Sequence, residues 1–252
     1  RQNLLFSATM PESIVKLASG FLDRPVRVEV TPQATTVELI DQKVMFTAKA
    51  DKRRLLASIL SGPEVDCAIV FTRTKHGANR VVKELAKSDI EAAAIHGNKS
   101  QAARTRALNG FRNGDIRVLV ATDIAARGID VDLVTHVFNY DIPNIPETYV
   151  HRIGRTGRAG RGGIAIAFCD ETEAGFLRSI ERLTGQEIPR DLDHPWHLPD
   201  AMPRAGVKYP KNPANNGGSR QGRGGRSDDR NRSSDNRRSG RGRRGRGPRS
   251  QN

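Results

Sequence analysis

Cysteine, aromatic residues and long apolar stretches are all scarce in this chain of 252 residues. Two cysteines are too few for a disulfide framework or for a zinc site built from four thiolates. Each lies in or beside an apolar run, Cys67 before Ala68–Phe71 and Cys169 after Ile164–Phe168, so we expect both thiols in the core. No stretch approaches the ~20 apolar residues of a membrane span, and no signal-peptide pattern is present. We therefore expect neither a disulfide framework, a metal site nor a membrane span.

The distribution of charge separates a body from a tail. Apolar residues make up 36% and aromatic residues 5% of the chain, which is low for a protein folded throughout, and the net charge is +14. Residues 204–252 hold 15 Lys and Arg against 3 acidic residues, a net charge of +12 that leaves +2 for residues 1–203. Their Arg/Gly/Ser repeats lack the apolar side chains needed to offset the entropy of ordering. We expect a nearly neutral folded body and a basic, disordered tail.

From Val37 to about Thr184, apolar runs of strand length alternate with runs of helical period. The expected strands are Lys43–Phe46, Ala68–Thr72, Ala92–Ile95, Val118–Ala121, Val134–Asn139 and Ile164–Phe168. The expected helices are Lys52–Leu60, Gly77–Lys87, Gln101–Phe111, Pro146–Gly154 and Thr172–Leu183. Several strand runs are wholly apolar, as in parallel strands covered on both faces. The pattern predicts an α/β fold whose ligands lie at the carboxyl ends of the strands.

Residues 1–30 do not have the pattern of a domain's beginning. The apolar run Leu4–Phe6 is typical of a strand, a helix is predicted after Pro11, and Val26–Val30 is predicted as a short strand. Residues 31–36 are polar, contain a proline and predict a linker. Because the chain opens with Arg1 beside an apolar run, we expect it to be part of a longer protein.

Polar and basic groups follow three of the predicted strands. These segments are Thr72–Lys75, His96–Ser100 with Gln101 and Arg104 on the next helix, and Thr122–Asp130. Hydroxyls, backbone amides and Lys or Arg at one sheet edge suit a phosphate backbone, which they position without reading bases. An ordinary loop capped by Asp123 is the alternative for the third segment. We interpret the edge as a nucleic-acid groove.

Three arginines recur at intervals of three in His151–Arg158. Arg152, Arg155 and Arg158 would share one helical face for as far as the helix from Pro146 lasts. A planar guanidinium makes two parallel hydrogen bonds to phosphate oxygens, so stacked arginines can clamp a polyphosphate. A solvated basic face is the other reading, and the pattern alone leaves both open.

Taken together, these motifs resemble those of the DEAD-box RNA helicases, in the same order along the chain. Ser7-Ala8-Thr9 resembles motif III, Val70–Thr74 motif IV, Gln101–Arg104 the QxxR motif, Thr122–Asp130 motifs V and Va, and His151–Arg158 motif VI. The resemblance covers about residues 1–190 and is closest to the bacterial RhlE-like subgroup. His151 favours DEAD-box over DEAH-type proteins, which usually carry Gln there.

The resemblance implies two RecA-like domains, each a parallel sheet with helices on both faces, that close on ATP and clamp RNA. Residues 1–30 would end the first (ATP-binding) domain and residues 31–36 would link it to the second (helicase C-terminal) domain, residues 37–190. Residues 191–252 would form the Arg/Gly-rich disordered tail. RNA, single-stranded or locally duplex, is the implied partner in a cytoplasmic protein, with ribonucleoprotein or RNA-degradation assemblies as candidate partners and no membrane.

The resemblance also implies the roles of single residues. Arg155 and Arg158 would be the catalytic arginine fingers on the γ-phosphate of ATP, and Asp130 would hold its ribose. The implied RNA contacts are Thr72, Arg73, Gly97, Gln101, Arg104 and Thr122. Ser7, Thr9 and His151 would couple the two domains. Arg152 is better interpreted as a structural or interdomain contact than as a third finger.

The departure from the family is the absence of its upstream motifs. The chain has no GxxxxGKT phosphate loop, no Asp-Glu-Ala-Asp box and no Q motif, so the ligands of the Mg²⁺ that accompanies ATP are expected upstream. We expect the chain alone neither to bind ATP well nor to hydrolyse it. Two alternatives remain: an RNA-binding module that acts through its tail, and a DNA helicase of a related superfamily.

Overall fold

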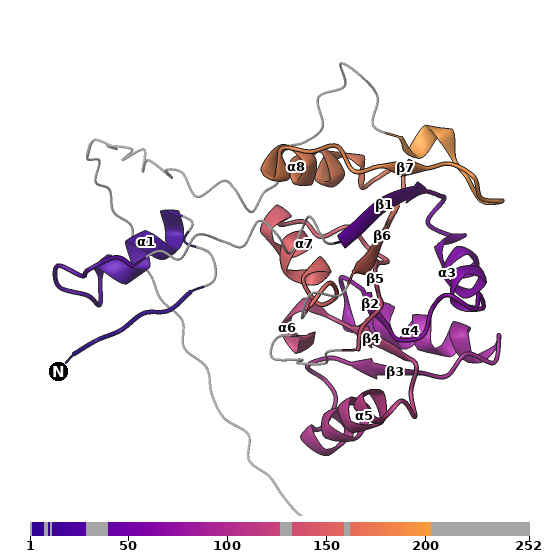
Figure 1. Ribbon diagram of the computed structural model, residues 1–252, viewed down its shortest axis with the longest axis horizontal. Helices are drawn as coiled ribbons and strands as arrows, with labels where there is room; N and C mark the ends of the chain where they lie inside the picture. The colour runs from indigo at the N-terminus through magenta and orange to yellow at the C-terminus, as the bar shows by residue number, and fades with distance from the viewer. Residues whose placement is uncertain are drawn as a thin grey trace, which may run out of the picture. The chain divides into compact units, whose positions relative to one another are not determined.

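The computed structural model describes residues 2–7, 10, 12–28, 40–126, 133–158 and 162–202 (Figure 1). Its centre is a seven-stranded sheet in the order β3-β4-β2-β5-β6-β1-β7, in which every paired strand runs parallel to its neighbour. The strands are β1 (Ile40–Phe46), β2 (Ala68–Phe71), β3 (Ala92–Ile95), β4 (Val118–Ala121), β5 (His136–Asn139), β6 (Gly163–Cys169) and β7 (Arg190–Asp191). The predicted parallel α/β sheet is confirmed.

Helices cover both faces of this sheet (Figure 1). They are α3 (Lys52–Leu60), α4 (Lys75–Ala86), α5 (Gln101–Asn113), α6 (Asp123–Ala126), α7 (Pro146–Ile153) and α8 (Ala174–Thr184), with a 3-10 turn, η1, at Pro199–Ala201. Helices α3 and α4 pack on one face, while α5, α6, α7 and α8 pack on the other. A separate helix, α1 (Glu12–Ser19), lies in the N-terminal segment.

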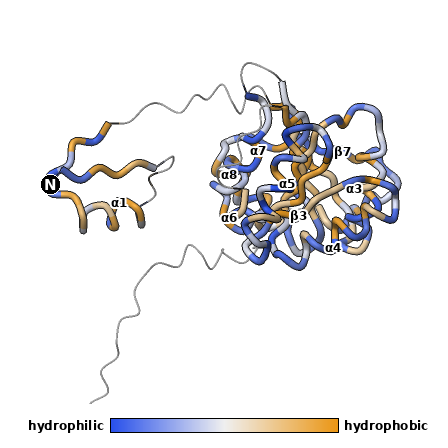
Figure 2. The backbone as a smooth tube through the Cα atoms, turned by 90° about the horizontal axis from the view of Figure 1, so that it is seen from below, coloured by the Kyte–Doolittle hydropathy of each residue, from blue (hydrophilic) through white to orange (hydrophobic). Residues whose placement is uncertain are grey.

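Each central strand contributes alternate side chains to the two cores. On β4, Val118 and Val120 join the core under α3 and α4, whereas Leu119 and Ala121 join the core under α5 and α6. All four are 0% exposed. In Figure 2 the hydrophobic stretches of the domain gather between the helices and the hydrophilic ones lie toward its outside. Burial on both faces explains why these strands are wholly apolar in sequence.

Side-chain caps start two helices at the carboxyl edge of the sheet. The Thr74 hydroxyl accepts a hydrogen bond from the Gly77 amide (3.0 Å) at the start of α4. The Ser100 hydroxyl accepts one from the Ala103 amide (3.3 Å) at the start of α5. Such caps satisfy amides that a helix leaves unbonded. They fix the loops after β2 and β3, which carry predicted site residues.

The packed body continues beyond the boundary predicted at residue 190, which corrects the start of the tail. β7 adds a seventh strand beside β1, and Thr47 and His197 form an antiparallel bridge. Ala201 is 0% exposed against the core formed with α7 and α8, where Leu198 and Met202 also pack. A two-residue strand has too short a pattern to be recognised from sequence. The predicted tail beyond residue 202 and the linker at 31–36 lie outside the described residues.

Three smaller predictions can be compared with the structure. Residues 26–28 form no strand, contrary to prediction, and residues 123–126 form the short helix α6, which was not among the predicted helices. The Cys169 thiol is buried, as predicted, whereas Cys67 is half-buried before β2. Burial, aided by the charge of Asp66, raises the pKa of Cys67 to about 11. Among the described residues, no helix is long and apolar enough to cross a membrane.

Candidate functional site

The three polar strand ends lie side by side because β3, β4 and β2 are neighbours in the sheet. Ile95, Ala121 and Phe71, the last residues of these strands, are paired in register. The Thr72 amide donates to the Ala121 carbonyl (3.0 Å), and the Thr122 amide donates to the Ile95 carbonyl (3.3 Å). The loops that follow therefore start at one level on one edge. The predicted shared edge is confirmed, and RNA contact at it stays a prediction.

Gly97, the next residue but one after β3, is exposed on this edge. A Cβ atom added at Gly97 would meet no other atom within 4 Å, so packing does not require glycine there. A glycine in open space lets another molecule approach the backbone closely. Thr122 is half-buried, while Thr72 is buried and its hydroxyl donates to the Thr74 carbonyl (3.2 Å). The amide and the hydroxyl of Thr72 are thus both bonded within the domain, and this 0% exposed residue presents no free donor to a phosphate.

The first turn of α5 supplies Gln101 and Arg104 to the same edge. Arg104 Nη1 donates to Gln101 Oε1 (3.2 Å), which orients the two side chains toward each other. The start of this 13-residue helix also carries the positive end of its dipole, which favours anions. The two residues thus reach the edge together, as the sequence predicts.

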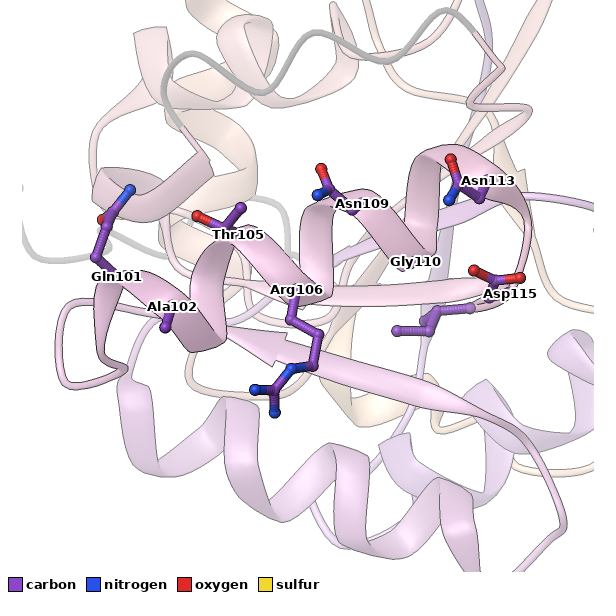
Figure 3. Close-up of a pocket in the computed structure, with 9 residues that line it drawn as sticks. Gln101, Ala102, Thr105, Arg106, Asn109, Gly110, Asn113 and Asp115 are labelled. Atoms are coloured by element: carbon purple, nitrogen blue, oxygen red, sulfur yellow. The ribbon is translucent and has the colours of Figure 1, made fainter.

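A shallow groove of about 740 Å³ runs along α5 from Gln101 toward Asp115. Figure 3 shows Gln101, Thr105, Asn109 and Asn113 in a row along the helix, one turn apart. Arg106 and Asp115 are the charged residues in its lining. One charge of each sign offers a phosphate backbone little attraction, so the groove adds only Gln101 to the candidate site.

His96, between β3 and Gly97, is 2% exposed. Its Nε2 lies 3.1 Å from Asn79 Oδ1 on α4, which ties the loop after β3 to that helix. Burial lowers the pKa of His96 below its usual value, and the nearby charges of Lys99 and Lys75 lower it further. The imidazole is thus held neutral at physiological pH.

Arg152 is buried and points into the domain. Its side chain is 1% exposed and forms a two-pronged ion pair with Asp123, with Nε to Oδ1 at 2.6 Å and Nη2 to Oδ2 at 2.9 Å. Nη1 donates to Asn139 Oδ1 (3.1 Å) and to the Asp141 carbonyl (2.7 Å). The guanidinium also lies over the Phe71 ring, 5.2 Å from its centroid. Arg152 therefore joins α7 to the ends of β2, β4 and β5.

Helix α7 ends at Ile153, one residue before the predicted end at Gly154, so of the three arginines only Arg152 lies on the helix. Arg155 and Arg158 lie in the turns that follow, where Arg158 Nε donates to the Gly154 carbonyl (2.9 Å). Gly157 has φ +66°, a backbone conformation that few residues other than glycine adopt. Arg155 and Arg158 are therefore presented by a turn rather than by a helix.

Arg155 borders a hollow of about 230 Å³ on this side of the domain. Its lining comes from the end of β2, from α6 and α7 and from the segment after α7: Phe71, Asp123, Ala126, Thr148, His151, Arg152 and Arg155. His151 is exposed there. The structure thus brings together His151, Arg152 and Arg155. Arg158 lies three residues after Arg155 and does not line the hollow.

Three further predicted site residues are Ser7, Thr9 and Asp130. Thr9 and Asp130 lie outside the described residues. Ser7 is exposed in the N-terminal segment. No group of three or more His, Cys, Asp or Glu side chains that could hold a metal ion occurs in the described parts of the chain.

Sequence reasoning missed the acceptors that hold the arginines. Asn139, Asp141 and Glu173 bond Arg152 or Arg73 but follow strands whose ends carry no motif of their own. Their signal is a polar or acidic residue at the end of an apolar strand. That signal becomes specific only when the order of strands is known.

Comparison with known proteins identifies the family. Residues 51–160 match the family described as the helicase conserved C-terminal domain. The DEAD-box ATP-dependent RNA helicase CshA of Geobacillus kaustophilus is 45% identical over 190 residues, which are 75% of this chain and 41% of that protein. The ATP-dependent RNA helicase CshA of Listeria monocytogenes is 45% identical over 188 residues, 75% of this chain and 36% of that protein. The chain spans about two fifths of the length of these curated relatives.

Solved structures agree with this assignment. The Escherichia coli DEAD-box protein SrmB, bound to regulator of ribonuclease activity A, matches with a TM-score of 0.62 at 34% identity, over 66% of this chain and 98% of that one. Saccharomyces cerevisiae Dbp5, bound to RNA and ADP BeF3, matches with a TM-score of 0.67 at 33% identity, over 74% of this chain and 50% of that one. The chain belongs to the DEAD-box protein family and carries its helicase C-terminal domain.

The buried His96 predicts a dependence of stability on pH. Its pKa is lowered in the folded state, so between its ordinary pKa of ~6.5 and the lower folded value only the unfolded chain binds the proton. We expect the free energy of unfolding to fall across this window as pH decreases, by at most about 1.4 kcal/mol per pH unit from this residue.

Urea unfolding from about pH 7 to about pH 5 tests this prediction. His96→Gln, which keeps a partner for Asn79, should flatten the dependence. His151→Gln, at an exposed position of α7, is the matched control and should keep it. The same pH dependence in the parent and in His96→Gln would contradict the assignment.

Proposed function

We propose that this chain is the second RecA-like domain, with its flanking segments, of an ATP-dependent RNA helicase. One observation carries the proposal: the ends of β3, β4 and β2 lie level on one edge, while Arg155 lies on an adjoining hollow. A row of loops offering amides and basic groups suits a phosphate backbone, and arginines suit a nucleotide phosphate. The relatives' names, DEAD-box ATP-dependent RNA helicase, support this function.

RNA would lie across the strand-end loops. The proposed contacts are Thr72, Arg73, Gly97, Gln101, Arg104 and Thr122, carried over from the family motifs. The exposure of Gly97 and the α5 N-terminus beside Gln101 support this placement. Contacts of this kind grip the backbone and select no sequence, as expected of an enzyme that opens many duplexes. Bending of one bound strand as two domains close would separate it from its complement.

ATP would be bound mainly by another domain and completed by this one. Arg155 and Arg158 would contact the γ-phosphate and stabilise the charge that develops during transfer, and Asp130 would hold the ribose. The turn that presents both arginines, outside any helix, supports their reaching a partner domain. His151, exposed beside Arg155, would couple the domains together with Ser7 and Thr9. Arg152 would support the segment that carries Arg155 and Arg158 through its buried bonds to Asp123, Asn139 and Asp141.

The phosphate loop and the Mg²⁺ ligands would be supplied upstream. The described residues contain no acidic cluster suited to the metal, and the sequence contains no GxxxxGKT loop. We propose that the chain alone does not hydrolyse ATP. Residues 1–30 would form the C-terminal end of the first domain, and residues 31–36 would link it to the second.

The proposed setting is the bacterial cytoplasm, with RNA as the main partner and ribonucleoprotein or RNA-degradation assemblies as protein partners. The relatives are bacterial proteins, and SrmB was solved with a regulator of ribonuclease activity. Assignment to the RhlE-like subgroup rests on the motifs alone, because the curated relatives named above are CshA proteins. A DNA helicase is disfavoured by these names, and competition between RNA and DNA in an ATPase assay distinguishes the two.

Replacement of the proposed fingers tests the enzymatic function. In the protein that carries this chain together with its ATP-binding domain, we expect Arg155→Ala or Arg158→Ala to lower RNA-stimulated ATP hydrolysis by about 10³–10⁵, because transition-state charge is left unbalanced. Arg182→Ala, at an exposed position of α8, is the matched control and should keep full turnover. Undiminished turnover in both finger variants would refute their role.

A second function, RNA binding by the tail, is favoured by the charge distribution. Residues 204–252 carry a net charge of +12, and arginines also stack on bases. In the isolated chain this would be the dominant activity. It needs neither ATP nor the sheet edge.

A salt titration separates tail binding from binding by the body. Binding through many Lys and Arg releases counterions, so affinity for single-stranded RNA should fall steeply with salt, with a slope of about −0.7 per phosphate contacted. We expect deletion of residues 204–252 to remove most of the affinity and most of the slope. If the truncated chain bound RNA as tightly, the tail would not be the anchor.

A further inference from the structure

Four loops at the carboxyl edge converge on one carboxylate, that of Glu173 before α8. Its Oε1 accepts from Arg73 Nη2 (2.7 Å) and from the Ile142 amide (3.1 Å). Its Oε2 accepts from Lys52 Nζ and from the Asp170 amide (3.4 Å). The donors follow β2, β5, β1 and β6, which are consecutive in the sheet as β2-β5-β6-β1. One side chain therefore ties together the ends of four adjacent strands.

This carboxylate is buried and its charges are matched. The Glu173 and Lys52 side chains are 2% and 1% exposed, and Lys52 also pairs with Asp170 at 3.0 Å. Burial alone would lower the pKa of Lys52, but Glu173 and Asp170 outweigh it and raise that pKa. Buried charges persist only when paired and bonded in this way. Loss of the carboxylate would leave Lys52 with one acidic partner, Asp170, among the described residues.

Through Arg73 the network reaches the loop after β2, where RNA is proposed to bind. The Arg73 guanidinium donates to Glu173 and to the Ile142 carbonyl (2.9 Å), and lies 5.6 Å from the centroid of the Phe176 ring. The Arg73 amide donates to Asp141 Oδ2 (2.8 Å). Backbone and side chain of this residue are thus both held from inside the domain. The Arg73 guanidinium is therefore occupied by contacts within the domain, which makes it less available to a ligand.

We propose that Glu173 is a positioning residue of the RNA-binding edge, and that it holds the Thr72–Thr74 loop in register with its neighbours through Arg73. The inference rests on the proposed RNA-binding function. It reassigns Arg73, which the family resemblance gives as an RNA contact, to a supporting role. Phosphate would be met by the backbone of the loop that Arg73 anchors.

The sign of the effect distinguishes positioning from charge. Glu173→Gln removes a negative charge near the RNA path, so electrostatics alone predicts tighter binding. Misplacement of a contact loop predicts weaker binding, by about tenfold or more. Glu171→Gln removes the same charge from an exposed position two residues away and is the matched control. Only a positioning role predicts that Glu173→Gln binds RNA more weakly while Glu171→Gln does not.

The experiment is a titration of the full chain with a single-stranded oligouridylate, followed by amide NMR at Gly97 and Thr122. These reporters lie on neighbouring loops, separate from the mutated residue and from the tail. We expect affinity at both amides to fall about tenfold in Glu173→Gln and to stay within about twofold in Glu171→Gln. Equal or tighter binding by Glu173→Gln would overturn the inference and leave RNA binding intact. No response of these amides in the parent chain would overturn RNA binding at this edge, and the inference with it.

Arg73→Gln is the second variant and decides the question if Glu173→Gln does not fold. The Arg73 side chain is 38% exposed, so its replacement leaves less unpaired charge in the core than replacement of the 2% exposed Glu173 does. A direct phosphate contact predicts that the slope of log affinity against log salt shrinks by about 0.7. We expect weaker binding at Gly97 and Thr122 with an unchanged slope. A reduced slope would return Arg73 to the RNA contacts and refute its supporting role.

Discussion

The guanidinium of Arg152 occupies the centre of the functional face, 1% exposed and bonded to groups from neighbouring strand ends. Asp123 after β4 and Asn139 and Asp141 at the end of β5 accept its hydrogen bonds, and Phe71 at the end of β2 lies against its plane. A buried cation costs several kcal/mol unless every donor is matched, so these acceptors are held to one arrangement. The starts of the segments that follow β4 and β5 are fixed by that requirement.

Two buried charge networks meet at Asp141. The Asp141 carbonyl accepts from the Arg152 side chain, and the Asp141 carboxylate accepts from the Arg73 amide. The side chain of Arg73 in turn donates to Glu173. Asp141 thus borders the arginine turn on one side and the loop after β2 on the other. In the proposed helicase the first side meets nucleotide and the second meets RNA. A rigid connection of this kind would keep the two surfaces at a fixed separation while the domains close.

Much of the fold was predictable because parallel strands buried on both faces leave unambiguous apolar runs, as in Val118–Ala121. The polar strand ends were predictable for the same reason, since Thr72 and Thr122 interrupt those runs abruptly. The order of strands was not, because it depends on contacts between segments far apart in the chain. Without the order of strands, nothing in the sequence distinguishes Glu173 from the other acidic residues. In the structure, Glu173 bonds four segments.

The end of α7 was predictable from local sequence, whereas the packing after residue 190 was not. The helix predicted at Pro146–Gly154 is observed at Pro146–Ile153, because its apolar period stops where the glycines begin. Packing after residue 190 depends on β7 and on isolated apolar residues such as Ala201, too few to produce a period. After residue 190, tertiary contacts outweigh local pattern.

Hydrogen exchange in an Arg152→Lys variant tests most directly whether one buried guanidinium fixes the functional face. Lysine keeps the charge but cannot match the forked geometry, so we expect the free energy of unfolding to fall by about 2 kcal/mol. Amides of α6 and of residues 141–142 should lose more protection than those of β4 and β2. Equal loss of protection throughout the sheet, or no loss at α6, would contradict the central position given to Arg152.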